Sequence, residues 1–168
     1  FAYTDIVIVS CGVNDLSRYG HTANSLADCI SRQFKFYSTR YPKTKFIFNS
    51  VLKSRDYRWL NNEVNVFNHH MFELSRSVRN MYYFDSDNLV ASCRFRNVYV
   101  TGRKFDLDHD FSMRVPENNN GIHVTLDVRR LVMRELVNSI GYLSGCRTAR
   151  FRNCGWLRNV TTRSSWPG

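Results

Sequence analysis

The feature that most constrains the fold is an alternation of short apolar runs with amphipathic helical segments. The runs at residues 5–11 (DIVIVSC), 45–52 (KFIFNSVL) and 81–84 (MYYF) are short and rich in β-branched or aromatic residues. Such runs are typical of strands, and the first is apolar enough to predict burial on both faces. Helical segments separate the runs, and this order predicts an α/β domain with a parallel sheet.

Three segments carry the spacing of amphipathic helices, with apolar residues recurring every three or four positions. The first covers residues 22–41 and is stopped by Pro42. The second covers residues 60–78, and its predicted inward positions are Leu60, Val64, Phe67, Met71, Leu74 and Val78. The third follows Thr125, a predicted N-cap, and its predicted inward positions are Val128, Leu131, Val132, Leu136 and Ile140.

The remaining segments are less regular. Residues 98–101 (VYVT) predict either a further strand or an extended loop, and residues 103–121 predict a long polar loop. Residues 144–168 contain several arginines and no acid, which predicts a flexible basic tail. We therefore expect one domain at residues 1–143, followed by the tail at 144–168.

Composition narrows the class of protein. Of the 168 residues, 43% are hydrophobic and 23% charged, values of an ordinary globular domain, and no apolar run approaches the roughly 18 residues that span a bilayer. The net charge of +10 favours contact with polyanions such as nucleic acid. The 5 cysteines include no Cys-x-x-Cys pair, which argues against a zinc site or disulfide framework and favours a reducing, intracellular compartment.

Residues suited to chemistry follow the first predicted strand and precede the last predicted helix. The first group is Gly12-Val13-Asn14-Asp15, and the second is the stretch NNGIHVT, which carries His123. Ligands of open α/β sheets bind at the carboxyl ends of the strands, where the first group lies and which His123 could reach. The alternatives are an ordinary turn, since Asn and Asp side chains bond nearby backbone amides, and a histidine that merely precedes a helix cap.

Together the two motifs resemble two of the four sequence blocks of the SGNH (GDSL-like) hydrolases. The resemblance covers residues 1 to about 143, and GIHVTLDVRRLVMRELVNSI is especially similar to the esterase-type domains of animal LINE-type retrotransposon proteins. It implies a three-layer α/β/α flavodoxin-like fold and a serine esterase acting on acyl esters without a cofactor. By this resemblance, Asn14 donates to the oxyanion from a turn with Gly12 and Asp15, and His123 is the base.

The chemistry of both residue types suits these roles. An amide NH2 is a neutral donor that can be held toward a growing negative charge, and one such donor contributes about 3–4 kcal/mol in a serine protease. Histidine titrates near pH 6.5, so it can accept and return a proton at neutral pH.

The sequence departs from the family pattern in two places. The family's serine and glycine blocks precede Gly-x-Asn-Asp, whereas Gly12 is the twelfth residue here. We therefore expect an N-terminally truncated domain that lacks its first strands and its nucleophile and is inactive as given. Ser10 and Ser17, which flank the motif, are expected to be ordinary strand-end and turn residues.

The second departure is Asn120, which stands where the family has the aspartate of Asp-x-x-His. An amide can orient His123 but brings no charge to stabilise an imidazolium. In the serine-protease template the same change lowers kcat about 10⁴-fold. Asp110 or Glu117 are the alternative sources of a carboxylate.

Three other interpretations of the sequence concern binding. The tail could bind RNA phosphates and bases through Phe151, Trp156 and the arginines Arg147, Arg150, Arg152 and Arg158. The acids of residues 106–117 have calcium-loop spacing, but Phe111 stands where that loop needs glycine, so we expect a solvated loop. His69 and His70 are adjacent and so lie on different helix faces, which predicts exposed side chains and not a metal site.

Overall fold

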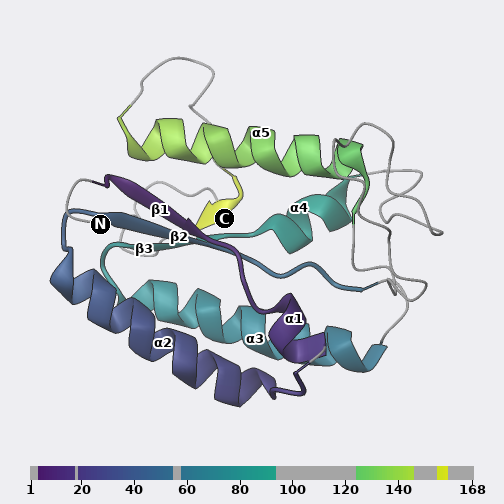
Figure 1. Ribbon diagram of the computed structural model, residues 1–168. Coiled ribbons are helices and arrows are strands. Elements are labelled where there is room, and N and C mark those ends of the chain that lie inside the picture. Colours follow the sequence, from purple (N-terminus) through teal and green to yellow (C-terminus); the bar gives the residue numbers. More distant parts are fainter. Residues whose placement is uncertain (1–3, 18, 55–57, 94–123, 146–154, 159–168) are drawn as a thin grey trace, which may run out of the picture.

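The computed structural model describes residues 4–17, 19–54, 58–93, 124–145 and 155–158. A four-stranded sheet in the order β1-β2-β3-β4 forms its centre, with helices on both sides (Figure 1). The elements in chain order are β1 (Ile6–Val9), α1 (Val13–Ser17), α2 (Ala23–Arg40), β2 (Lys45–Asn49), α3 (Arg58–Ser77), β3 (Met81–Phe84), α4 (Ser86–Ser92), α5 (Leu126–Leu143) and β4 (Leu157–Arg158).

The expected parallel sheet is confirmed for its first three strands. β1 pairs with β2 and β2 with β3, both in parallel, whereas β4 pairs with β3 in antiparallel orientation. α2 and α3, which connect these parallel strands, cover one face, and α4 and α5 cover the other (Figure 1). Two right-handed crossovers that advance in one direction place both of their helices on the same face, which explains this layering.

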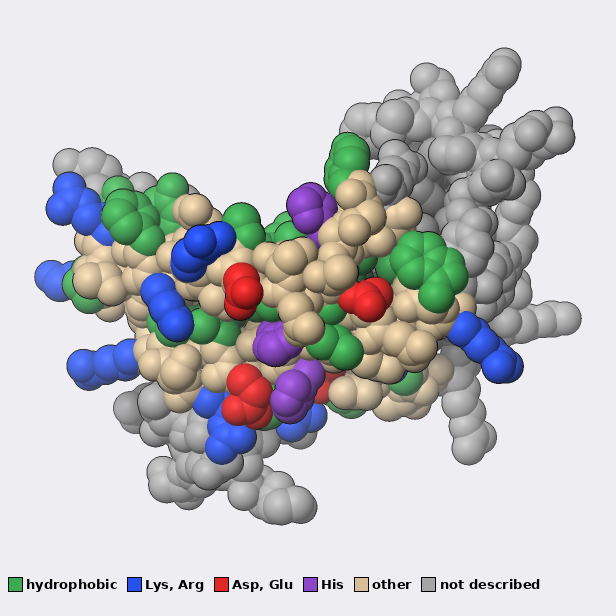
Figure 2. All heavy atoms as spheres, turned by 90° about the horizontal axis from the view of Figure 1, so that it is seen from below, with side chains coloured by type: hydrophobic (Ala, Val, Ile, Leu, Met, Phe, Trp, Pro, Cys, Tyr) green, Lys and Arg blue, Asp and Glu red, His purple; other side chains and the backbone are tan. Residues whose placement is uncertain are grey.

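Each face of the sheet has its own apolar core. The core between the sheet and α2 and α3 contains Phe34, Phe48 and Phe67, with the Phe48 ring set edge-on against the other two. The core on the α4 and α5 side is smaller and centres on Ile47 and Phe84. The outward surface of α2 and α3 is polar, with Lys and Arg side chains grouped toward one half of it (Figure 2).

The three long helices lie where the apolar spacing predicts them. In α2 the Thr22 side chain accepts a capping bond from the Ser25 N–H at 3.2 Å. All six predicted inward residues of the second helix are buried, from Leu60 to Val78. Thr125 stands at the N-cap of α5, but its side chain accepts no capping bond. The predicted inward residues of α5 are buried, as at Val128 and Leu136, or half-buried.

β1 differs from the expectation of burial on both faces. Within the described residues β1 pairs only with β2, so it is an edge strand of this sheet. Its Ile8 side chain is 39% exposed, and Met133 and Val137 of α5 are also exposed. The run of apolar residues correctly predicted a strand, but burial depends on neighbours that the run itself does not contain.

Three short elements were not anticipated: α1, α4 and β4. β4 lies within the segment expected to be a tail, and its Leu157 is 3% exposed and belongs to the core on the α5 side. The stretches at residues 98–101 and 103–121 fall outside the described residues. Among the described helices, none combines the length and the apolar character that crossing a bilayer requires.

Candidate functional site

The Gly12 turn stands at the carboxyl end of β1, packed tightly against α3. Gly12 is buried with a φ of 113°, a conformation that favours glycine. A Cβ at this position would lie 2.7 Å from Cε1 of Phe67 and 3.3 Å from Cγ2 of Val51. The chain therefore needs glycine here, both for the backbone conformation and for space.

Asn14 and Asp15 lie in α1, directly after this turn. The backbone closes the helix, since the Gly12 carbonyl accepts from the Leu16 N–H at 3.0 Å and the Asn14 carbonyl from the Tyr19 N–H at 3.3 Å. The Asn14 side chain is exposed, and among the described residues the side chains of Asn14 and Asp15 form no hydrogen bond. The alternative of an ordinary turn needs these side chains to bond backbone amides, and no such bond is present among the residues that the structure describes.

The two serines that flank the motif, Ser10 and Ser17, have no catalytic partner among the described residues. The Asn49 amide at the end of β2 donates to Ser10 Oγ at 3.1 Å, which links the ends of β1 and β2. The Ser17 hydroxyl is buried and has no partner within the described part of the chain. Neither hydroxyl is bonded to a histidine among these residues.

Burial and charge also affect the thiol next to the turn. Desolvation raises the pKa of Cys11, and the nearby Asp15 carboxylate raises it further. Cys11 therefore holds its proton at neutral pH and is a poor nucleophile.

The second half of the predicted site, His123 and Asn120, lies outside the described residues, as do Asp110 and Glu117. The described chain resumes at Val124, immediately before α5. α5 begins at the end of the molecule that also holds α1 and α4, which is where β1 and β3 end (Figure 1).

The ends of β2 and β3 are joined by a buried serine pair. The Oγ atoms of Ser50 and Ser86 are 3.2 Å apart, and Ser86 Oγ donates to the Ser50 carbonyl at 2.9 Å. Ser50 Oγ in turn accepts from the Asp87 N–H at 3.0 Å, and the Asp87 carboxylate pairs with Lys53 at 2.9 Å. These contacts fix the start of α4 and leave no free nucleophile there.

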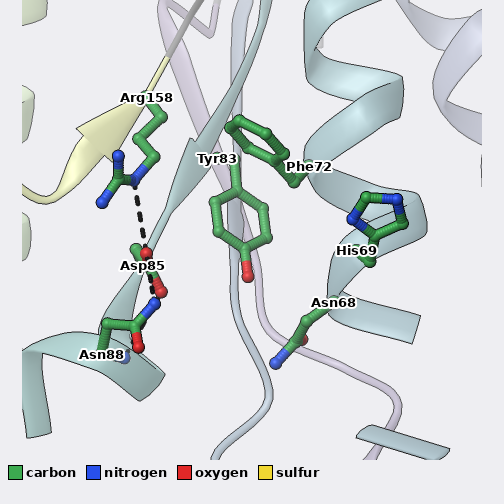
Figure 3. A pocket seen from close by; sticks show the side chains of 7 residues that line it. All are labelled: Asn68, His69, Phe72, Tyr83, Asp85, Asn88 and Arg158. Atoms are coloured by element: carbon green, nitrogen blue, oxygen red, sulfur yellow. Dashed lines mark hydrogen bonds and ion pairs between the residues drawn. The ribbon is translucent and has the colours of Figure 1, made fainter. Parts of the chain in front are cut away.

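A cavity of about 290 Å³ lies beyond β3, between α3, α4 and β4. Its lining residues are Asn68, His69, Phe72, Tyr83, Asp85, Asn88 and Arg158 (Figure 3). None of them comes from β1 or α1, so the cavity is separate from the Gly12 turn. The sequence did not predict it because the cavity depends on the packing of α3, β3 and α4 and on β4, which comes from a distant part of the chain.

Asp85 is the buried charge of this cavity. Its side chain is 6% exposed, caps α4 by accepting from the Asn88 N–H at 3.4 Å, and lies 3.3 Å from Nε of Arg158. The Arg158 Nε–H forms no hydrogen bond there, so the contact is electrostatic. Burial raises the pKa of Tyr83 well above its ordinary value, and the Asp85 carboxylate adds to this.

The other predicted binding residues are placed as follows. Arg158, expected in the RNA-binding tail, is the partner of Asp85, whereas Arg147, Arg150 and Arg152 lie outside the described residues. His69 and His70 are exposed, as expected, and His70 Nε2 lies 2.8 Å from the Asn24 side-chain oxygen. Within the described ranges no group of His, Cys, Asp and Glu side chains is arranged to hold a metal ion.

Comparison with known proteins gives a likeness of fold alone. No family model matches the chain, and no curated protein matches it in sequence. A solved structure from Streptococcus pneumonia, described as a "putative platelet activating factor", superposes with a TM-score of 0.58 and 15% identity over 83% of this chain. The match covers 59% of that protein, so the present chain spans less than two thirds of its length.

Proposed function

We propose that this chain is part of an SGNH-type ester-hydrolase domain, in which Asn14 donates to the oxyanion and His123 is the base. The observation that carries the proposal is the Asn14 amide. It is exposed, has no partner among the described residues, and stands at the carboxyl end of a parallel strand. Only a group that is not already bonded can donate to a developing oxyanion without first breaking a contact.

Two further features support the proposal. Gly12 packs closely against the Phe67 ring, and close packing of the turn that carries Asn14 favours the fixed position that a preorganised donor requires. The start of α5, three residues after His123 in the sequence, lies at the same end of the sheet (Figure 1). The α/β fold shared with the structure from Streptococcus pneumonia is compatible with this family but does not by itself assign an activity.

We also propose that these 168 residues alone do not hydrolyse esters. The described hydroxyls near Asn14, those of Ser10 and Ser17, form no hydrogen bond to a histidine among the described residues, and an amide at Asn120 has no charge to offer His123. The attacking hydroxyl of the proposed site is therefore not among the described hydroxyls near Asn14, and an oxyanion donor and a base without a nucleophile give no turnover.

An assay with p-nitrophenyl acetate tests the catalytic part. We expect hydrolysis by the 168-residue chain to equal that of buffer, and the variants Asn14→Ala and His123→Ala to be the same. Hydrolysis that His123→Ala abolishes would mean that the chain carries its own nucleophile, contrary to the proposal.

A second experiment tests whether Asn14 and His123 meet. The NMR signals of the Asn14 side-chain NH2 are followed between about pH 5 and 8, the range in which histidine titrates. We expect a transition in the wild-type chain that disappears in His123→Ala and persists in His21→Ala. His21 is the matched control because its N–H bonds the Asp15 carbonyl at 3.2 Å, close to the motif. A transition that survives His123→Ala would refute the shared site.

A further inference from the structure

The C-terminal half of α2 carries an exposed row of alternating cationic and aromatic side chains. Arg32, Phe36 and Arg40 are spaced four residues apart, so they lie along one line of the helix. Phe36 is 62% exposed and Arg32 and Arg40 are also exposed. Packing among the described residues does not explain an exposed aromatic ring between two arginines.

More aromatic and basic groups adjoin this row. Tyr37 is 36% exposed, its ring lies 5.2 Å from that of Phe36 in an edge-on arrangement, and it stacks on Tyr41 at 6.3 Å. Lys35 and Lys43 are exposed. We call this surface the α2 patch: Arg32, Lys35, Phe36, Tyr37, Arg40 and Lys43.

The charge of the patch is not neutralised locally. Residues 29–44 contain no Asp or Glu, and the acid of α2, Asp28, lies one turn before Arg32. None of the four cations of the patch forms an ion pair with a described residue. In Figure 2 the Lys and Arg side chains gather on one half of the face formed by α2 and α3, with hydrophobic side chains among them. The whole chain carries +10, so this surface attracts polyanions over a distance.

We infer that the α2 patch binds single-stranded nucleic acid, with the cations on the phosphates and Phe36 stacked on an unpaired base. Exposed rings beside cations are the combination that single-strand binders use, because every base has a face on which a ring can stack. A duplex keeps its bases stacked on one another and would leave Phe36 without a partner. This surface is separate from the proposed ester-hydrolase site, so either proposal can fail without the other.

Fluorescence anisotropy with a labelled oligo(U) of about 12 nucleotides tests the inference, a length within the site sizes of single-strand binders. We expect binding that weakens as NaCl rises from about 50 to 200 mM. Phe36→Ala should weaken binding about tenfold at constant salt, the scale of one lost base stack. The double variant Arg32→Gln/Arg40→Gln should reduce the slope of log K against log salt by about 1.4, since each phosphate contact on a single strand contributes about 0.7.

Matched controls lie elsewhere on the surface. Trp59→Ala removes an aromatic side chain that is 52% exposed at the start of α3, and Arg130→Gln/Arg134→Gln removes two cations from α5. Both should bind oligo(U) like the wild type. Thermal melting of each variant checks the fold, which substitutions at exposed positions leave intact.

Three results would overturn the inference. The first is no binding of oligo(U) at about 50 mM NaCl, where phosphate contacts are strong. The second is wild-type binding by Phe36→Ala and by the α2 double variant, with binding lost when Arg147, Arg150 and Arg152 are changed to Gln. The third is Phe36-dependent binding to phosphatidylserine vesicles without binding to oligo(U), which would assign the patch to an anionic membrane surface.

Discussion

The side-chain amide of Asn68 bonds both backbone groups of Val51: Oδ1 accepts from the Val51 N–H at 2.9 Å, and Nδ2 donates to the Val51 carbonyl at 2.8 Å. Asn61, two helical turns earlier on the same face of α3, does the same for Ser54, at 2.6 and 2.7 Å. The two asparagines thus hold the loop after β2 along α3. This matters for the Gly12 turn, because Val51 is one of the two residues that close the space around Gly12.

Replacing Asn68 should therefore be costly. Asn68 is 7% exposed, and Asn68→Ala leaves the N–H and carbonyl of Val51 without their partners in a buried place. We expect the free energy of unfolding to fall by about 2–4 kcal/mol, measured by urea denaturation. Asn61→Ala is the control at a half-buried position, where water can replace the amide, and should cost less. Equal losses in the two variants would mean that burial does not set the cost.

Substitution of Gly12 tests the tight turn. Gly12→Ala would place a Cβ 2.7 Å from the Phe67 ring at a φ of 113°. We expect a loss of about 2–4 kcal/mol in urea denaturation, because strain at the turn and displacement of the ring add. Gly20→Ala is the comparison, because Gly20 has a φ of 66° but nothing within 4 Å of an added Cβ. It should cost about 1 kcal/mol, and a cost as large as that at Gly12 would show that backbone conformation alone matters.

Local sequence patterns predicted most of the fold because its long elements carry their own signals. α3 buries residues at every predicted position, and the apolar run of β2 leaves Phe46, Ile47 and Phe48 buried. α4 was missed because its seven residues are too few for a helical period, although Asp85 is an N-cap residue that could have indicated it. β4 has two residues, and only its pairing with β3 defines it.

The candidate site was also predictable only in part. The position of Gly12 and Asn14 at the end of a strand could be predicted, since both follow directly from the run that forms β1. The contact between Gly12 and Phe67 could not, because it joins residues far apart in the chain. The charge of Arg158 was assigned to the tail, and its pairing with Asp85 depends on the fold bringing β4 beside β3.

Thiol reactivity checks the environment of the turn. Cys29 is exposed, whereas burial and Asp15 raise the pKa of Cys11. With iodoacetamide at about pH 8, a little below the ordinary thiol pKa, we expect Cys29 to react well before Cys11, because only the thiolate attacks. Mass spectrometry of the digested protein measures both rates. Modification of Cys11 as fast as Cys29 would contradict the half-buried position and the raised pKa of the Cys11 thiol.

Alkaline pH should destabilise the fold through Tyr83. Its pKa is raised above the ordinary value of 10.0 by burial, so the folded chain keeps the proton that the unfolded chain loses. The contribution of Tyr83 to the free energy of unfolding is fully present below about pH 10. It is lost as pH rises further, by up to about 1.4 kcal/mol per pH unit. Urea denaturation between about pH 9 and 11 should show a smaller decline for Tyr83→Phe than for the wild type. The same decline in both proteins would exclude Tyr83 as the source.

The contact between Asp85 and Arg158 should stabilise the chain beyond what two exposed charges achieve. The carboxylate is 6% exposed and the arginine side chain 43%, so water screens the pair from one side only. A double-mutant cycle with Asp85→Asn, Arg158→Met and the double variant measures the coupling in urea denaturation. We expect about 1 kcal/mol or more, above the typical exposed pair. Arg158→Met alone should cost more than the coupling, because it leaves a buried carboxylate without its cation and weakens β4. Additive losses would mean that the two side chains act independently and that β4 is held by Leu157 and its backbone bonds alone.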